Sequence, residues 1–179
     1  MKRAEVRFAG EGGQGLILAA VILAETAARG GLHVVQSEQY GPESRGGTTW
    51  ADVIIGGDEI DYPQATELDV LVALSGKGLE RSLALLGPGG LLLGDAARVR
   101  PPNGFDGRRV LLPFAEISRK AAGRAVPPNM AALGALAALT DFMSIEAIAE
   151  TMARRAPAGT AAANLKALES GHAAARATM

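Results

Sequence analysis

Six residues near the start of the chain, Gly10-Glu11-Gly12-Gly13-Gln14-Gly15, have the composition of a loop that contacts a phosphate. Glycine tolerates positive φ angles and lets a ligand approach the backbone closely. The apolar segment that follows is expected to be a helix, whose first N–H groups attract anions. Gly10, Gly12 and Gly15 also match the G-x-G-x-x-G spacing of dinucleotide-binding loops. A pyrophosphate or another anion is the expected ligand, and an unliganded strand-to-helix turn is the simpler alternative.

A second glycine-rich loop, Tyr40-Gly41-Pro42-Glu43-Ser44-Arg45-Gly46-Gly47, follows later in the chain. Arg45 offers a fork of N–H donors to a phosphate or carboxylate, with the amides of Gly46 and Gly47 beside it. Pairing with a nearby acidic residue or with a partner subunit is the alternative for Arg45. Tyr40 is expected to cover a ligand or to pack in an interface.

The elements around these loops predict that both face the same site. Residues 3–9 alternate polar and apolar as a strand does, residues 15–28 form an almost entirely apolar helix, and residues 32–36 form a second strand. A strand–helix–strand unit of this kind is parallel and right-handed. The loops after its two strands therefore lie at the carboxyl edge of the sheet, where α/β proteins bind ligands.

The remaining elements complete an α/β fold with three αβα layers, a mostly parallel sheet, a Rossmann-like start and a helical C-terminal portion. Further strands are predicted at 48–55, 68–74, 91–93 and 110–112, and helices at 115–123, 129–142, 145–155 and 161–176. Ser144 and Thr160 stand where helix N-caps belong. The stripe of Leu165, Leu168 and His172 is expected to face the core. We expect residues 1–179 to form one domain.

The helix predicted at 129–142 carries many small residues. These are Ala131, Ala132, Gly134, Ala135 and Ala138. They would let another backbone approach closely, or they reflect no more than high helix propensity.

Composition excludes several kinds of site. The chain has no cysteine, so disulfides, cysteine nucleophiles and cysteine-ligated iron–sulfur clusters are absent. The two histidines, His33 and His172, are expected to be structural, and we predict no metal site and no catalytic residue. Aromatic residues make up 4% and the net charge is −1, which argues against nucleic-acid binding. No apolar stretch has the length of a signal peptide or a membrane span, which favours a cytoplasmic protein.

Taken together, these motifs resemble the γ subunit, or γ-type domain, of 2-oxoacid:ferredoxin oxidoreductases. The first loop is similar to the family's G-x-G-G-Q-G opening, and the second to its Y-G-P-E-x-R-G-G signature. The strand at Ala51–Ile55, the Asp69–Leu74 segment and the small residues that follow Asn129 extend the resemblance over nearly the whole chain.

The resemblance implies a function in a complex. Such enzymes decarboxylate a 2-oxoacid on thiamine diphosphate, pass electrons through iron–sulfur clusters to ferredoxin and transfer the acyl group to coenzyme A. It places thiamine diphosphate and the clusters on α, β and ferredoxin-like δ partners. This chain would support the catalytic subunits, be inactive alone and help to bind coenzyme A at the two loops, with no firmly bound cofactor of its own. The first expected substrate is 2-oxoglutarate, with pyruvate, branched-chain oxoacids and indolepyruvate open.

Two other functions remain open on the residues alone. A Rossmann protein that binds NAD(P) or FAD would use Gly10, Gly12 and Gly15, with Glu38 on the ribose. An assembly scaffold would use both loops only to contact protein. A homodimer of the isolated chain is also compatible with the sequence.

Overall fold

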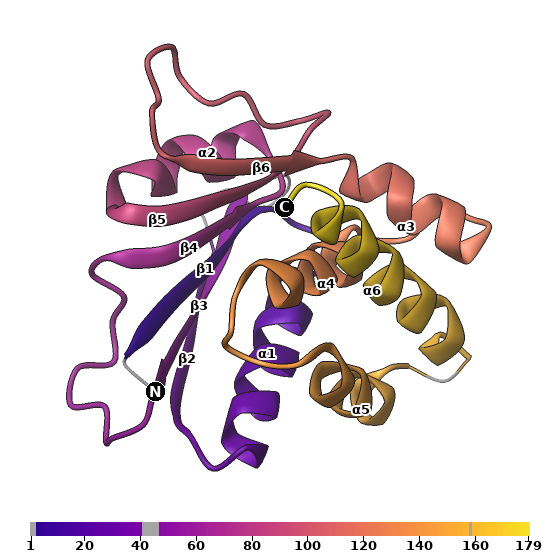
Figure 1. The fold of residues 1–179 in the computed structure, drawn as a ribbon, viewed down its shortest axis with the longest axis horizontal. Helices are drawn as coiled ribbons and strands as arrows, with labels where there is room; N and C mark the ends of the chain where they lie inside the picture. The colour runs from indigo at the N-terminus through magenta and orange to yellow at the C-terminus, as the bar shows by residue number, and fades with distance from the viewer. Residues whose placement is uncertain (1–2, 41–46, 158) are drawn as a thin grey trace.

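The computed structural model describes residues 3–40, 47–157 and 159–179 of the chain. A six-stranded sheet in the order β2-β3-β1-β4-β5-β6 forms its centre (Figure 1). The strands are β1 (Ala4–Glu11), β2 (His33–Tyr40), β3 (Thr48–Gly56), β4 (Leu68–Ala73), β5 (Leu86–Asp95) and β6 (Arg108–Leu112). The helices are α1 (Leu16–Arg29), α2 (Gly76–Ser82), α3 (Phe114–Ala122), α4 (Asn129–Leu139), α5 (Ile145–Arg155) and α6 (Ala161–Arg176), with a 3₁₀ turn η1 (Leu83–Leu85).

Strand direction confirms the mostly parallel sheet and reveals an antiparallel strand within its first unit. β1, β4, β5 and β6 pair in parallel, whereas β3 runs antiparallel between β1 and β2. β1 and β2 therefore point the same way, as expected, but they are not neighbours. The expected parallel strand–helix–strand unit of β1, α1 and β2 is present, with β3 inserted between its two strands.

Helices cover the two faces of the sheet unequally. On one face, α1 and α3–α6 pack over a large apolar core that includes Val6, Phe8, Val72 and Leu93. On the other face, a smaller cluster around Leu71 joins the sheet to α2 and to the segment that follows β5. The three-layer α/β fold is confirmed, with most of the helical mass on one side. α1 is covered nearly all round, as its apolar sequence predicts: Leu16 through Ala27 contains no exposed residue.

The small residues of α4 allow close contact with α6. A Cβ built at Gly134 would lie 1.9 Å from the Leu168 carbonyl oxygen, and one built at Gly171 would lie 1.9 Å from that of Ala131. The two helix backbones therefore touch. The close approach expected from the small residues is confirmed, and its partner is another helix of the same chain.

Helix ends follow the sequence in part. The Ser144 hydroxyl accepts a hydrogen bond from the Ala147 N–H, so it caps α5 as expected. Thr160 stands at the start of α6, but its hydroxyl donates to the Pro157 carbonyl instead of capping the helix. Leu165, expected in the core, is exposed, while Leu168 on the same helix is fully buried.

Candidate functional site

The first glycine loop lies where β1 ends and α1 begins, at the carboxyl edge of the parallel strands. Gly12 and Gly13 are exposed, and a Cβ added at either would meet no atom within 4 Å. Gly13 and Gly15 have φ angles of +87° and +77°, which other residues adopt only with strain. The first turn of α1 has no capping side chain, so its N–H groups are available to a ligand at this edge. The loop thus has the open backbone that an anion requires.

Gln14 holds this loop in shape. Its side chain is 8% exposed; its Oε1 accepts the Glu11 N–H at 2.7 Å, and its Nε2 donates to the Leu74 carbonyl at 2.8 Å. A Cβ at Gly10 would lie 2.2 Å from Gln14 Oε1, so glycine is needed there for the brace to fit. The sequence predicts Gln14 as a ligand-binding residue; its amide makes these two bonds within the protein, and the residue also lines a hollow on the Arg98 side of the loop.

Asn129, the first residue of α4, fixes the other end of the loop. Its Nδ2 donates to the Gly15 carbonyl at 3.0 Å, and the side chain is buried. A Cβ at Gly15 would lie 2.3 Å from that nitrogen. Glycine at this position therefore allows both the left-handed φ angle and the contact with α4.

One hollow of about 270 Å³ lies between the glycine loop and the end of β2. It is lined by Gly12, Gly13, the first turn of α1 and Tyr40, whose ring is 65% exposed. Tyr40 at the end of β2 pairs with Thr49 of β3, and Glu11 at the end of β1 pairs with the adjacent Thr48. The ends of β1 and β2 therefore lie at the same edge of the sheet, which confirms the predicted shared edge at Tyr40. Gly47 is half-buried. Arg45 and Gly46 lie outside the described residues.

A larger hollow of about 540 Å³ lies on the other side of Gly12 and Gly13. Two arginines that sequence reasoning missed, Arg98 and Arg119, line it together with Pro127 and Pro128. Arg98 follows the carboxyl end of β5, where ligand-binding residues often lie. This position in the sequence could have identified Arg98 as a candidate. Arg119 is in the second turn of α3, and nothing in the sequence indicates that it faces the loop.

The electrostatics of this edge favour a ligand with several negative charges. The nearest oxygen of Glu11 is 3.9 Å from Arg98 Nη1, and Arg98 is half exposed, so this ion pair is weak. The Arg119 side chain makes no hydrogen bond or ion pair with any described residue, although its charge helps to lower the pKa of Glu116. Exposed glycine amides, a helix N-terminus and two arginines can therefore bind phosphate groups on both sides of the loop.

Glu38 does not take the place that a dinucleotide site requires. In a Rossmann fold the second strand adjoins the first, which brings its acidic residue to the ribose. Here β3 separates β2 from β1, so the two strands are about 10 Å apart at the usual interstrand spacing. Glu38 lines a separate hollow with Arg7, Trp50 and Asp52.

Neither histidine is part of this site. His33 is exposed at the start of β2, and His172 is half-buried on α6. Within residues 3–40, 47–157 and 159–179, no three His, Asp or Glu side chains are grouped to hold a metal ion. No helix in the same residues is long and apolar enough to cross a membrane.

Comparisons with known proteins agree with this architecture. Residues 5–174 match the family model described as pyruvate ferredoxin/flavodoxin oxidoreductase. The 2-oxoglutarate synthase subunit KorC of Methanothermobacter marburgensis is 36% identical over 94% of this chain and 95% of its own length. The crystal structure of a keto/oxoacid ferredoxin oxidoreductase gamma subunit from Geobacter sulfurreducens is 38% identical, with a TM-score of 0.89 over 99% of this chain and 98% of that one.

A longer protein contains the same fold as one part of its chain. The 2-oxoglutarate:ferredoxin oxidoreductase of Magnetococcus marinus, solved with 2-oxoglutarate, coenzyme A and succinyl-CoA bound, matches with a TM-score of 0.87 and 26% identity. The match covers 99% of this chain and 32% of that chain. Both loops, the fold and these relatives agree: the chain belongs to the pyruvate ferredoxin/flavodoxin oxidoreductase family, as one of its γ-type members.

Proposed function

We propose that the chain is the γ subunit of a multi-subunit 2-oxoacid:ferredoxin oxidoreductase that converts 2-oxoglutarate to succinyl-CoA. The similarity to KorC chains over nearly their full length supports 2-oxoglutarate as the substrate. Thiamine diphosphate, which stabilises the carbanion left by decarboxylation, and the iron–sulfur clusters belong to the α, β and δ partners. The chain itself supports these subunits and supplies part of the coenzyme A site.

The glycine loop between two hollows is the observation that carries the coenzyme A assignment. Coenzyme A has a diphosphate and a separate 3′-phosphate on one nucleotide. The diphosphate suits the exposed amides of Gly12 and Gly13 and the first turn of α1. The further phosphate suits Arg98 and Arg119 in the larger hollow. The coenzyme A bound to the Magnetococcus marinus enzyme supports the same ligand.

The test is coenzyme A affinity in the assembled complex. We expect Arg119→Ala and Arg98→Ala each to raise the KM for coenzyme A by about tenfold or more, because a hydrogen bond between charged groups contributes about 1.5–3 kcal/mol. The KM for 2-oxoglutarate should stay unchanged. Lys166→Ala on α6 is the matched control, because Lys166 is exposed and lines neither hollow at the loop.

The competing proposal is an assembly scaffold without a ligand. An unchanged KM for coenzyme A in both arginine variants would favour it. Gln14→Ala is a poor test of this choice, because the Gln14 amide braces the loop and its loss would disturb the site indirectly. Activity with pyruvate but not 2-oxoglutarate would contradict the substrate assignment alone.

A further inference from the structure

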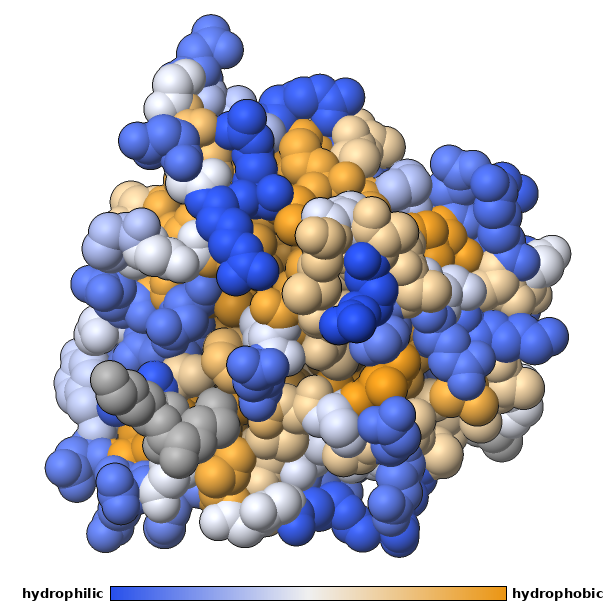
Figure 2. Space-filling view, viewed as in Figure 1, coloured by the Kyte–Doolittle hydropathy of each residue, from blue (hydrophilic) through white to orange (hydrophobic). Residues whose placement is uncertain are grey.

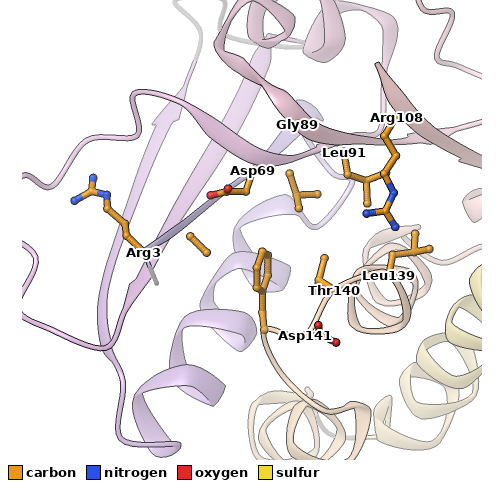
Figure 3. A pocket seen from close by; sticks show the side chains of 11 residues that line it. Arg3, Asp69, Gly89, Leu91, Arg108, Leu139, Thr140 and Asp141 are labelled. Carbon is orange, nitrogen blue, oxygen red and sulfur yellow. The ribbon is translucent and has the colours of Figure 1, made fainter. Parts of the chain in front are cut away.

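The opposite edge of the sheet, where the strands begin, holds another hollow, of about 410 Å³ (Figure 3). Its floor is apolar and buried: Val70 of β4 is opposite Leu91 of β5, and Leu139 ends α4 beside them. Arg108, opposite Leu91 in β6, reaches toward the end of α4. Asp69 lies on the other side of Leu91, and its carboxylate points away from Arg108.

Three charges on this rim lack a full partner. The side chains of Arg108 and Asp141 make no hydrogen bond or ion pair with any described residue. Asp69 accepts the Glu5 N–H at 2.7 Å through Oδ2, and its Oδ1 has no partner among the described residues. Among the residues that the structure describes, the hollow therefore presents one cation and two carboxylates without an ion-pair partner around an apolar floor.

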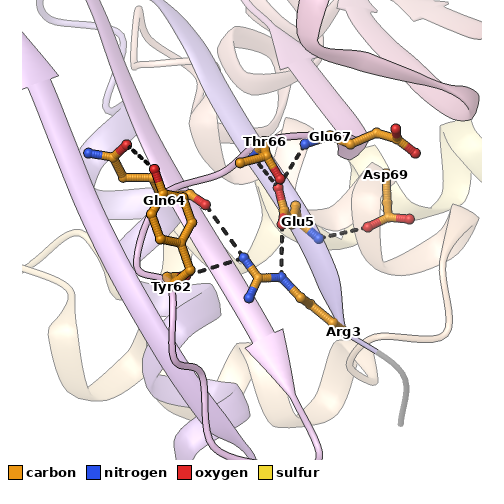
Figure 4. Close-up of polar contacts among 7 residues, drawn as sticks. All are labelled: Arg3, Glu5, Tyr62, Gln64, Thr66, Glu67 and Asp69. Carbon is orange, nitrogen blue, oxygen red and sulfur yellow. Dashed lines mark hydrogen bonds and ion pairs between the residues drawn. The ribbon is translucent and has the colours of Figure 1, made fainter.

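The Asp69 side of the rim is held rigidly by the buried carboxylate of Glu5 (Figure 4). Glu5 accepts the Thr66 and Glu67 N–H groups at 2.6 and 3.1 Å and pairs with Arg3 at 2.8 Å. Arg3 also lines the hollow, but its guanidinium is directed to Glu5, and its Nη2 donates to the backbone carbonyls of Tyr62 and Gln64. This network joins the start of β1 to the segment before β4, so the hollow is preformed.

A protein surface fits this hollow better than a small molecule does. Asp69, Arg108 and Asp141 are all exposed. Water therefore weakens the attraction between these charges and a small bound ion. A macromolecular partner that covers the floor excludes that water and makes the charges effective together. Figure 2, which has the same view as Figure 1, shows hydrophobic residues lying between hydrophilic ones on this face of the molecule.

We propose that this hollow is the docking site for the catalytic partner subunit, which presents a basic group to Asp69 and Asp141 and an acidic group to Arg108. The Magnetococcus marinus chain supports this occupant, because there the same fold is about a third of one polypeptide. In that protein the γ-type fold is covalently joined to the rest of a longer chain. As a separate subunit, the present chain would contact its partners through a non-covalent interface. The inference rests on the proposed function in a complex, but not on the coenzyme A site.

The absence of cysteine allows a direct test. A Cβ added at Gly89, which lines the hollow, meets no atom within 4 Å, so Gly89→Cys places one unique thiol there. We expect its reaction with a maleimide to slow at least tenfold when the chain is assembled with its co-expressed partners. A thiol at the exposed α6 position, Lys166→Cys, should react equally fast in both states. A photo-crosslinker attached at position 89 should join the chain to one catalytic subunit.

Charge reversal tests the chemistry of the contact. Arg108→Glu should weaken capture of the partner subunits at least tenfold, with the melting temperature of the isolated chain unchanged, whereas Lys166→Glu should do neither. Equal labelling at position 89 in the free and assembled states, a crosslink only to a second copy, or undiminished capture by Arg108→Glu would overturn the docking site. If the wild-type chain assembled with no 2-oxoacid oxidoreductase subunit, the proposed function itself would fail.

Discussion

Gln14 illustrates a residue whose position in a motif and role in the fold differ. Its Oε1 and its Nε2 each make a hydrogen bond inside the protein, so it shapes the loop, and its contact with a ligand in the larger hollow that it lines stays a prediction. Gln14→Glu replaces the Nε2 donor with an oxygen that faces the Leu74 carbonyl. We expect a loss of stability at neutral pH of about 1–3 kcal/mol, the usual cost of an unsatisfied buried group.

The pH dependence of that loss identifies its cause. A protonated Gln14→Glu side chain regains a donor for Leu74, so folding raises the pKa of the new carboxyl above its unfolded value. The restored stability is present at low pH and is lost as the pH rises through the raised pKa. Urea unfolding at pH 5 and pH 8 should show a smaller gap from wild type at pH 5. A gap that is the same at both pH values would mean that the bond to Leu74 contributes little.

The pair of Arg7 and Asp52 makes the sheet sensitive to single substitutions. Arg7 donates to both Asp52 oxygens at 2.6 and 2.7 Å, stacks 5.4 Å from the Trp50 ring centroid, and is buried like its partner. Asp52→Ala would leave an uncompensated buried charge and should cost about 3–5 kcal/mol. The double variant Arg7→Met/Asp52→Leu should recover most of this in urea unfolding. Strictly additive losses would contradict the coupling.

Among the elements, the contact between α4 and α6 depends on two glycines. Ala is normally favoured over Gly in a helix by about 1 kcal/mol, yet a methyl group at position 134 would overlap the Leu168 carbonyl. We expect Gly134→Ala to be destabilising by about 1–3 kcal/mol or more, because overpacking outweighs helix propensity. Gly89→Ala, with open space around its Cβ, is the control and should be neutral. A raised melting temperature for Gly134→Ala would show that the helices separate easily.

The sequence pattern predicted the bounds of elements with a clear apolar periodicity. It failed for strands whose length is set by pairing with residues distant in the sequence. The α5 and α6 bounds were predicted to the residue, since apolar and capping positions mark them. β2 was predicted to end at 36 but extends to Tyr40, because polar Ser37, Glu38 and Gln39 pair with β3. β5 was predicted as 91–93, since the glycines and proline before it are not typical of strands.

The candidate site was likewise predicted only where its residues leave a local signal in the sequence. The glycine loop and Tyr40 stand out in sequence because special backbone geometry and a shared sheet edge leave local signals. Arg98 and Arg119 reach the loop only through the packing of the post-β5 turn and α3, which a single sequence does not encode locally. The role of Gln14 also depends on a carbonyl sixty residues away.

At the scale of the whole molecule, the sheet separates two tasks. Its carboxyl edge carries the glycine loop and Arg119, and its amino edge carries Asp69 and Arg108. The parallel strands β4, β5 and β6 join these edges through the buried residues of β4 and of the second half of β5, so a change at one edge should not alter the other. Substitutions at distant sites with no shared partner usually have additive effects.

The two sites should therefore give separable defects in one enzyme. Arg119→Ala should raise the KM for coenzyme A while partner capture stays at the wild-type level. Arg108→Glu should reduce capture, yet the fraction of complex that still assembles should have a wild-type KM for coenzyme A. The double variant should show both defects, with each free-energy change within about 0.5 kcal/mol of its single-variant value. Titration of the partner subunits against each variant, followed by steady-state kinetics on the isolated complex, measures both. Strong non-additivity would mean that docking reshapes the glycine loop, and that the sheet transmits the change between its edges.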